Sequence, residues 1–248
     1  MDKDQPAVEL DHISKTFEAR MVLEDITFQV NTGQAFCLLG RSGTGKSVTL
    51  KIIIGLIKPD KGKVWVQGNE IQNLGTQKLA NVRKRIGFLF QEAALFDSIS
   101  VADNVAFPLR RHTRKSEDEI RTIVHEKLKE VELENEGTKM PAELSGGMSK
   151  RAGLARALAL DPTVLLIDEP SSGLDRMTAA EIYELLLRLK KKQKVTMVVV
   201  THDVRGATNF ADRFAVLDHG KIAGVGTADE LAASQNSLVR NLAKGSQT

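Results

Sequence analysis

The stretch "GRSGTGKS", residues 40–47, decides the fold. It fits the pattern G-x-x-x-x-G-K-[ST], in which backbone N–H groups wrap phosphates, the lysine reaches the outer phosphates and the hydroxyl reaches Mg²⁺. "AFCLLG" before it is a short apolar run typical of a buried strand, and "KSVTLKIIIGL" after it is typical of a helix. A strand, this loop and a helix in that order predict an α/β nucleotide-binding fold, with Lys46 on the phosphates and Ser47 on Mg²⁺.

A strand that ends in acidic residues is the expected partner of this loop. In "VLLIDEP", residues 164–170, an apolar run delivers Asp168 to the magnesium ion. Glu169 follows beside the position of the outermost phosphate, where a carboxylate can act as general base on a water molecule. Taken alone, the pattern also fits a strand that ends in solvated acids, and the lysine loop favours the catalytic interpretation.

The pattern along the chain predicts two α/β stretches around a helical insertion. Helical spacing dominates from about residue 92 to 151, where Ser116 and Glu119 form the pattern of a capping box. Strands and helices alternate on both sides of this region. We expect strands at 8–17, 23–30, 35–40, 63–68, 85–90, 163–168 and 195–202, a hairpin at 213–226, and helices at 46–56, 116–133, 177–192 and from 228 until the chain end frays.

Composition limits the class of protein. The 248 residues include 42% hydrophobic and 27% charged residues, as in ordinary globular proteins. The net charge of +3 is too small to predict a nucleic-acid-binding face. The single cysteine, Cys37, excludes an internal disulfide, and its apolar surroundings predict burial. No apolar run approaches the roughly 18–20 residues of a membrane span, so we expect a cytoplasmic protein whose membrane role would need a separate partner.

A second glycine-rich stretch raises a question. "ELSGGMSKR", residues 143–151, places a serine and two glycines before a helix-prone basic run. Backbone N–H groups at such a helix start form a plausible phosphate cradle. One domain would then carry two phosphate loops about a hundred residues apart.

The order of the motifs along the chain resembles that of a known family, and this resemblance explains why one domain would carry two phosphate loops. Strand–"GKS"–helix, "LSGG", "LLIDEP", "SGLD" and "VVVTHD" follow one another here, and the set resembles the ATP-binding cassette (ABC) ATPases over essentially the whole chain. The resemblance implies an α/β, RecA-like P-loop core with an N-terminal antiparallel β subdomain and an inserted helical subdomain. We expect one domain over 1–248, with the core at 1–91 and 151–226, the helical subdomain at 92–150 and a short helical tail at 227–248.

The same resemblance implies ATP and Mg²⁺ and assigns roles to residues. Phe17 would stack on adenine, Gln91 would sense Mg²⁺ and the attacking water, and His202 would contact the γ-phosphate. Catalysis would rest on Lys46, Gln91, Glu169 and His202, and Mg²⁺ would be held by Ser47, Gln91 and Asp168. Each role has a plainer alternative: a core phenylalanine, an exposed glutamine, a structural histidine. The implied nucleotide site comprises Phe17, Gly40, Arg41, Ser42, Gly43, Thr44, Gly45, Lys46, Ser47, Val48, Gln91, Asp168 and His202.

The second loop matches the family signature, usually L-S-G-G-Q, with methionine in place of glutamine. In the family this signature faces the nucleotide of the other subunit, so the two loops would serve different ATP molecules in a homodimer. Two smaller departures, Val48 for a common threonine and Gly173 for a common alanine, remove no charge or ligand. The residues expected to act across the dimer are Ser145, Gly146, Gly147, Met148 and Asp175.

The stretch "FQEAALFDSISVADNVAFPLRRHT", together with "LSGGM", looks most like the ATPases of Mla/Mce-type lipid transporters. That branch implies membrane permease subunits, a lipid-binding Mce-domain protein, transport of (phospho)lipid between bacterial membranes, and a place on the inner face of the cell membrane. The permease would dock near residues 91–113. Candidates for lining that groove are Phe96, Val101, Val105, Phe107 and Leu109, each of which also fits ordinary packing.

Three rival functions remain open at this point. An importer, a lipoprotein extractor or a division-associated complex would share every catalytic motif. A non-transport ABC ATPase acting on DNA or the ribosome would carry a long coiled coil or a second cassette, and the chain has neither. A P-loop small-molecule kinase would need neither "LSGG" nor a histidine after the last core strand.

Overall fold

Two β-sheets form the framework of the chain, and the computed structural model describes residues 6–243. The smaller sheet is antiparallel, in the order β2-β1-β4-β5, and the larger has the order β10-β9-β3-β8-β7-β6. In the larger sheet β9, β3, β8, β7 and β6 are parallel, and β10 is antiparallel to β9. The strands are β1 (Val8–Phe17), β2 (Arg20–Val30), β3 (Ala35–Leu39), β4 (Lys61–Val66), β5 (Asn69–Glu70), β6 (Ile86–Leu89), β7 (Val164–Asp168), β8 (Thr196–Thr201), β9 (Arg213–Asp218) and β10 (Lys221–Gly226).

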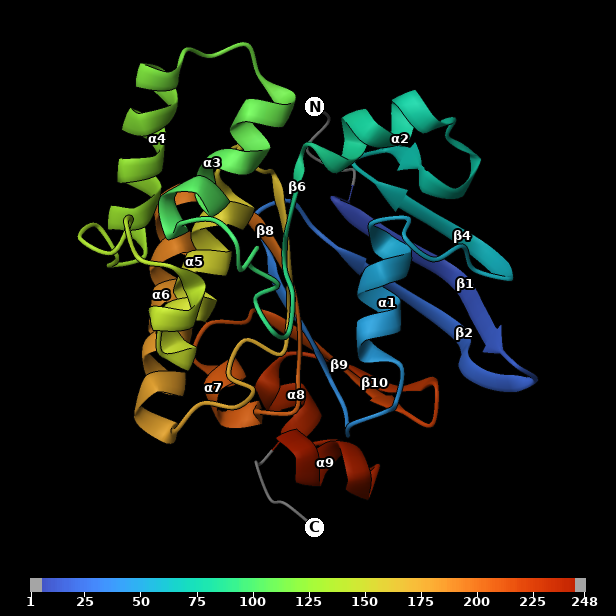
Figure 1. Cartoon of the computed structure of the whole chain (residues 1–248). Helices are drawn as coiled ribbons and strands as arrows, with labels where there is room; N and C mark the ends of the chain where they lie inside the picture. Colours follow the sequence, from blue (N-terminus) through green and yellow to red (C-terminus); the bar gives the residue numbers. More distant parts are fainter. Residues whose placement is uncertain (1–5, 244–248) are drawn as a thin grey trace.

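Helices cover both faces of the larger sheet (Figure 1). One face carries α3 to α7, and the other faces α1 and the antiparallel sheet. The helices are α1 (Lys46–Ile53), α2 (Thr76–Arg83), α3 (Val101–His112), α4 (Glu117–Glu130), α5 (Gly146–Leu158), α6 (Arg176–Gln193), α7 (Val204–Thr208), α8 (Ala228–Ala232) and α9 (Ser237–Ala243), with 3-10 turns at Ile71–Asn73 and Pro141–Glu143.

Side chains of β3 alternate between two buried faces of the sheet, which explains why the strand is apolar at every position. Ala35, Cys37 and Leu39 belong to the hydrophobic cluster under the helices, whereas Phe36 and Leu38 belong to the cluster shared with the antiparallel sheet. A parallel strand covered on both faces needs apolar residues at every position. The predicted burial of Cys37 is confirmed.

The fold class predicted from the sequence is confirmed, and so are the central strands and the terminal hairpin. The capping box of α4 is present, with the Ser116 side chain accepting from the Glu119 N–H and the Glu119 side chain from the Ser116 N–H. The helix expected at 46–56 ends earlier, at Ile53, because the chain then turns through Gly55 at a φ of 72°. Helix α2, strand β5 and helix α7 were not predicted.

The expected boundaries of the helical subdomain and of the C-terminal tail can be compared with the structure. Helix α5 runs without a break across residues 150 and 151, where the expected boundary between helical subdomain and core lies. The expected fraying falls partly on residues 244–248, which lie outside the described part. Among residues 6–243 no helix has both the length and the apolar character needed to cross a membrane.

Candidate nucleotide site

Strand register brings the ends of three strands to one edge of the larger sheet. Leu39 of β3 pairs with Thr201 of β8, and Asp168 of β7 pairs with Val200 of the same strand. The loop at 40–47, the acidic end of β7 and His202 therefore all leave the sheet at the same edge. Ligands of open parallel sheets bind at this carboxyl edge.

Glycine is required inside the loop at 40–47. Gly45 has a φ of 107°, and a Cβ there would lie 2.6 Å from Leu23 Cδ2. Both the backbone conformation and the space therefore exclude a larger residue. Helix α1 begins at the next residue, Lys46, so its first N–H groups face the loop. This is the arrangement that binds phosphate at a helix N-terminus.

Lys46 is the charged centre of this edge. Its side chain is 5% exposed, and its Nζ donates to Gly40 O at 2.9 Å and Arg41 O at 3.0 Å. The same Nζ lies 3.0 Å from Glu169 Oε1. A buried ammonium needs such partners, and phosphate oxygens would be equivalent acceptors. The structure thus places the predicted lysine and the predicted base in direct contact.

Asp168 and Ser47 are in direct contact at the same edge of the sheet. Ser47 Oγ donates to Asp168 Oδ1 at 2.8 Å. Burial raises the pKa of the Asp168 carboxyl, the Ser47 hydrogen bond opposes this rise, and the neighbouring Glu169 charge adds to it. A cation beside Asp168 would stabilise its charged form.

Glu169 joins the lysine to the histidine after β8. Its Oε2 lies 2.9 Å from His202 Nδ1 and accepts from the His202 backbone N–H at 3.3 Å. Glu169 has a φ of 46°, in the left-handed region that non-glycine residues seldom occupy. Such backbone conformations cluster at functional sites. Lys46, Glu169 and His202 therefore form one connected set.

The oxygens of this edge fit Mg²⁺. Ser47 Oγ and the Asp168 carboxylate are hard oxygen donors already in contact, and Mg²⁺ prefers one or two such ligands together with water and substrate phosphates. No group of three or more His, Cys, Asp or Glu side chains able to hold a metal occurs between residues 6 and 243. A site completed by ATP itself is consistent with both observations.

Gln91 lies at the border of this set. It follows β6 and is exposed. Its Nε2 donates to Ser172 Oγ at 3.4 Å, and Ser172 is close to Glu169 in sequence. Its position as a ligand of Mg²⁺ stays a prediction.

Phe17 lies at the end of β1 and is 40% exposed, with Lys15 Nζ 5.2 Å from its ring centre. The contact of Phe17 with adenine also stays a prediction. Val48 packs against the cluster beneath the antiparallel sheet.

The residues predicted to act across a dimer form a separate cluster. Ser145 caps α5, with its Oγ accepting from the Met148 N–H at 3.2 Å, and Asp175 caps α6, accepting from two N–H groups of that helix. A Cβ on Gly146 would lie 3.2 Å from Leu174 Cδ2, so the two helix starts touch. Ser145, Gly146 and Asp175 are exposed.

Sequence reasoning missed two buried polar groups next to the site. Lys150 on α5 donates to the backbone carbonyls of Gln91 and Glu169. Tyr183 on α6 places its hydroxyl 3.0 Å from Ser171 Oγ and 3.2 Å from Thr201 Oγ1. A lysine in a basic run predicts a solvated side chain, and a tyrosine at helical spacing predicts core packing, so the sequence carries no signal for either contact.

The fold and this site define the class of protein. The glycine-rich loop between β3 and α1, at the carboxyl edge of a parallel sheet, is the arrangement that P-loop ATPases share. The family described as "ABC transporter" matches residues 23–172. The chain therefore belongs to the ABC transporter family and is an ABC ATPase.

Similar proteins extend this assignment over nearly the whole chain. The "Probable ribonucleotide transport ATP-binding protein mkl" of Mycobacterium leprae is 42% identical over 96% of this chain and 69% of its own length. The "Intermembrane phospholipid transport system ATP-binding protein MlaF" of Haemophilus influenzae is 40% identical over 98% of this chain and 92% of its own. The solved "Dimeric structure of a post-hydrolysis state of the ATP-binding cassette MJ0796 bound to ADP and Pi" has a TM-score of 0.83 and 34% identity, and covers 89% of this chain and 98% of that one.

Proposed function

We propose that two copies of the chain close around two ATP molecules, and that each ATP lies between the loop at 40–47 of one copy and the Ser145 loop of the other. The observation that carries this proposal is the division of the phosphate-binding residues into two clusters on one chain. One cluster surrounds the buried Lys46, and the other, at the start of α5, exposes Ser145 and Gly146 while Gly147 is buried. The dimeric cassette with ADP and phosphate supports the proposal by similarity.

The proposed reaction is ATP plus water to ADP plus phosphate. Lys46 and the first N–H groups of α1 bind the outer phosphates, and Glu169 accepts a proton from the attacking water. His202, held by Glu169 Oε2, contacts the γ-phosphate, and Gln91 orients the water. Ser47 and Asp168, with Gln91, would hold Mg²⁺, which would neutralise charge on the phosphates. Because the γ-phosphate bridges the two copies, ATP binds the closed state better than the open one.

We further propose that the cargo is lipid, as in an Mla/Mce-type complex with a membrane permease and an Mce-domain protein. The 40% identity to the phospholipid-transport relative over almost its full length supports this. The other relative is named as a ribonucleotide transport protein, which supports ribonucleotides as a second cargo class. In either case the ATPase would lie on the cytoplasmic face of the membrane that holds its permease.

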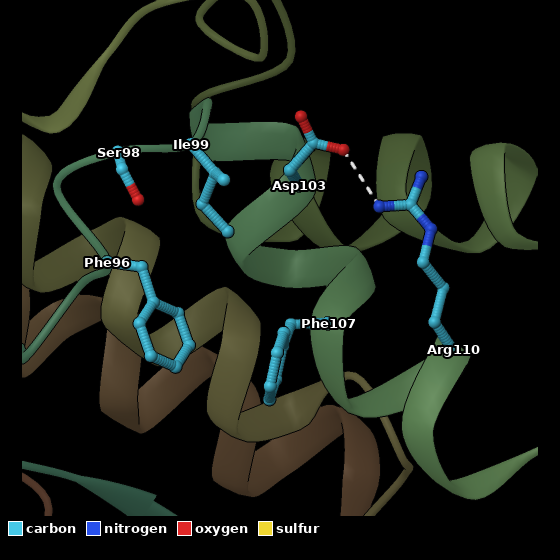
Figure 2. A pocket seen from close by; sticks show the side chains of 6 residues that line it. All are labelled: Phe96, Ser98, Ile99, Asp103, Phe107 and Arg110. Carbon is cyan, nitrogen blue, oxygen red and sulfur yellow. Dashed lines mark hydrogen bonds and ion pairs between the residues drawn. The ribbon is translucent and has the colours of Figure 1, made fainter.

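A pocket on α3 is the proposed docking site of the permease. Its volume is about 520 Å³, and Figure 2 shows Phe96 and Phe107 below the ion pair between Asp103 and Arg110. The two rings are 45% and 46% exposed, with their centres 4.8 Å apart. An exposed aromatic pair of this kind suits an apolar anchor from a partner helix. Three of the five expected groove residues do not line the pocket, because they face the helical core instead: Val101, Val105 and Leu109.

Purification of the tagged chain from detergent-solubilised membranes tests the cargo and the pocket together. Co-purification of a permease with an Mce-domain protein is the expected result, and a permease of another transporter class would overturn the lipid proposal. Phe107→Ala should abolish co-purification without changing ATP turnover of the isolated chain. Leu56→Ala removes a side chain of similar exposure elsewhere and is the matched control. Equal recovery of the permease with both variants would exclude this pocket as the docking site.

A further inference from the structure

Lys150 is a buried lysine that forms no salt bridge within residues 6–243. It lies on α5, five residues after Ser145, and is 6% exposed. No acidic residue between 6 and 243 forms a salt bridge with it, and burial lowers the pKa of its ammonium. Burying such a group is costly unless it is well bonded. The acceptors that offset this cost show what the residue does.

Both acceptors are backbone carbonyls of proposed catalytic residues. Lys150 Nζ donates to Gln91 O and, at 3.2 Å, to Glu169 O. Gln91 follows β6 and Glu169 follows β7, so one ammonium bridges the ends of two neighbouring strands. The contact uses only the backbone carbonyls, so Lys150 occupies neither functional side chain.

Helix α5 also holds the segment after Gln91. Arg156 donates to Ala93 O and Ala94 O, both at 2.7 Å, and a Cβ on Gly153 would lie 3.1 Å from Ala93 Cβ. Lys150, Gly153 and Arg156 are spaced three residues apart and share one face of the helix. The segment at 91–94 is thus fixed to α5 at several points, whereas Glu169 is joined to α5 by Lys150 alone among the hydrogen bonds of the described residues.

We propose that Lys150 is a positioning residue for ATP hydrolysis: it holds the backbones of Gln91 and Glu169 of its own chain at a fixed separation and ties both to the helix that carries Ser145. This inference rests on the proposed roles of Glu169 and Gln91. It makes α5 the link between the site that a chain builds for its own ATP and the loop that it offers to the partner's ATP.

The first test compares Lys150→Met with Lys150→Arg in the full chain. Methionine has a similar length and no donor, whereas arginine keeps the charge and the donors. We expect Lys150→Met to lower kcat about tenfold, as for loss of buried hydrogen bonds from a charged group, with the KM for ATP changed less than about twofold. Lys150→Arg should recover most of kcat. Normal kcat in Lys150→Met, or a rise in KM with kcat intact, would overturn the proposal.

Mixed dimers separate this role from general damage to α5. With Lys150→Met on one chain and Glu169→Gln on the other, the remaining active site uses the chain that lacks Lys150. Its turnover should fall about tenfold below that of the wild-type/Glu169→Gln dimer. With both substitutions on one chain, the remaining site takes only its signature loop from that chain and should match the same reference. The opposite pattern would place the role of Lys150 in the partner's site and overturn the inference.

Glu169→Gln homodimers keep the two proposals distinguishable. Near-normal turnover in Glu169→Gln would refute the assignment of the general base, whatever Lys150→Met does. Inactive Glu169→Gln together with fully active Lys150→Met would refute the positioning role alone. If Lys150→Met fails to fold, Lys150→Gln, which keeps two N–H donors without the charge, is expected to lie between wild type and Lys150→Ala in kcat. Equal kcat in all three would contradict the proposal.

Discussion

The loop at 40–47 and the loop at 145–147 have similar residue types but differ in burial. Both combine serine, glycine and a helix N-terminus. In the first loop the lysine is 5% exposed and contacts Glu169, the proposed base of the same chain, whereas Ser145 and Gly146 of the second loop are exposed. The difference teaches that the first loop is completed by its own fold and that the second is available to another molecule.

Contacts around the two loops explain how they differ. The first loop is held by β3, by Leu23 under Gly45 and by the end of β7. The second rests on the start of α6, where Leu174 and Thr178 approach its glycines. The strands on either side therefore fix the position of the first loop, whereas the contact between the starts of α5 and α6 fixes the position of the second.

Glu169→Gln is the variant with the largest expected effect on the first loop. It removes the proposed general base while preserving the size of the side chain beside Lys46 and His202. Phosphate release should fall by roughly 10²–10⁴-fold, the usual range for such a group. ATP should still bind, and the dimer should persist in size-exclusion chromatography. Glu126→Gln, at an exposed site on α4, is the control.

Glycine substitutions should destabilise the two loops for different reasons: lack of space at Gly147 and an unfavourable backbone conformation at Gly45. A Cβ on Gly147 would meet Thr178 Cγ2 at 2.5 Å, so Gly147→Ala should lower the free energy of unfolding by about 1–3 kcal/mol. Thr178→Ser removes that methyl, keeps the hydroxyl bonded to Asp175, and should restore most of the loss. Gly45→Ala should not be restored by Leu23→Val, because its φ of 107° remains unfavourable for any side chain. Chemical denaturation measures both pairs, and rescue in both would contradict this distinction.

Met148→Gln has the smallest expected effect. The Met148 backbone N–H, which glutamine also supplies, donates to Ser145 Oγ. The half-buried Met148 side chain packs at the edge of the helical core. ATP turnover should stay within about twofold of wild type, as for substitutions away from buried contacts. Leu154→Gln on the same helix is 1% exposed and should unfold the protein far more readily in a thermal melt. Complete loss of turnover in Met148→Gln would show that the methionine has a specific role.

The sequence predicts the parts of the site that follow strands better than the parts held by helices. An apolar strand ends directly beside each of three site residues: Asp168, Glu169 and His202. The apolar pattern of the strand, and the point where that pattern stops, therefore locate these residues in the sequence. The sequence gives no helical period for α2 because this eight-residue helix is mostly polar and buries only Val82. The contacts of Lys150 join residues 59 and 19 positions away, and no local pattern encodes such distances.

The central claim is that the two loops serve different ATP molecules, and mixing two inactive variants tests it most directly. Lys46→Ala disables the first loop and Ser145→Arg blocks the second, so each homodimer should hydrolyse ATP at background rates. A mixed dimer retains one intact site, made by the first loop of the Ser145→Arg chain and the second loop of the Lys46→Ala chain. ATP hydrolysis should therefore return on mixing. Normal hydrolysis by either variant alone, or no recovery in purified mixed dimers, would contradict it.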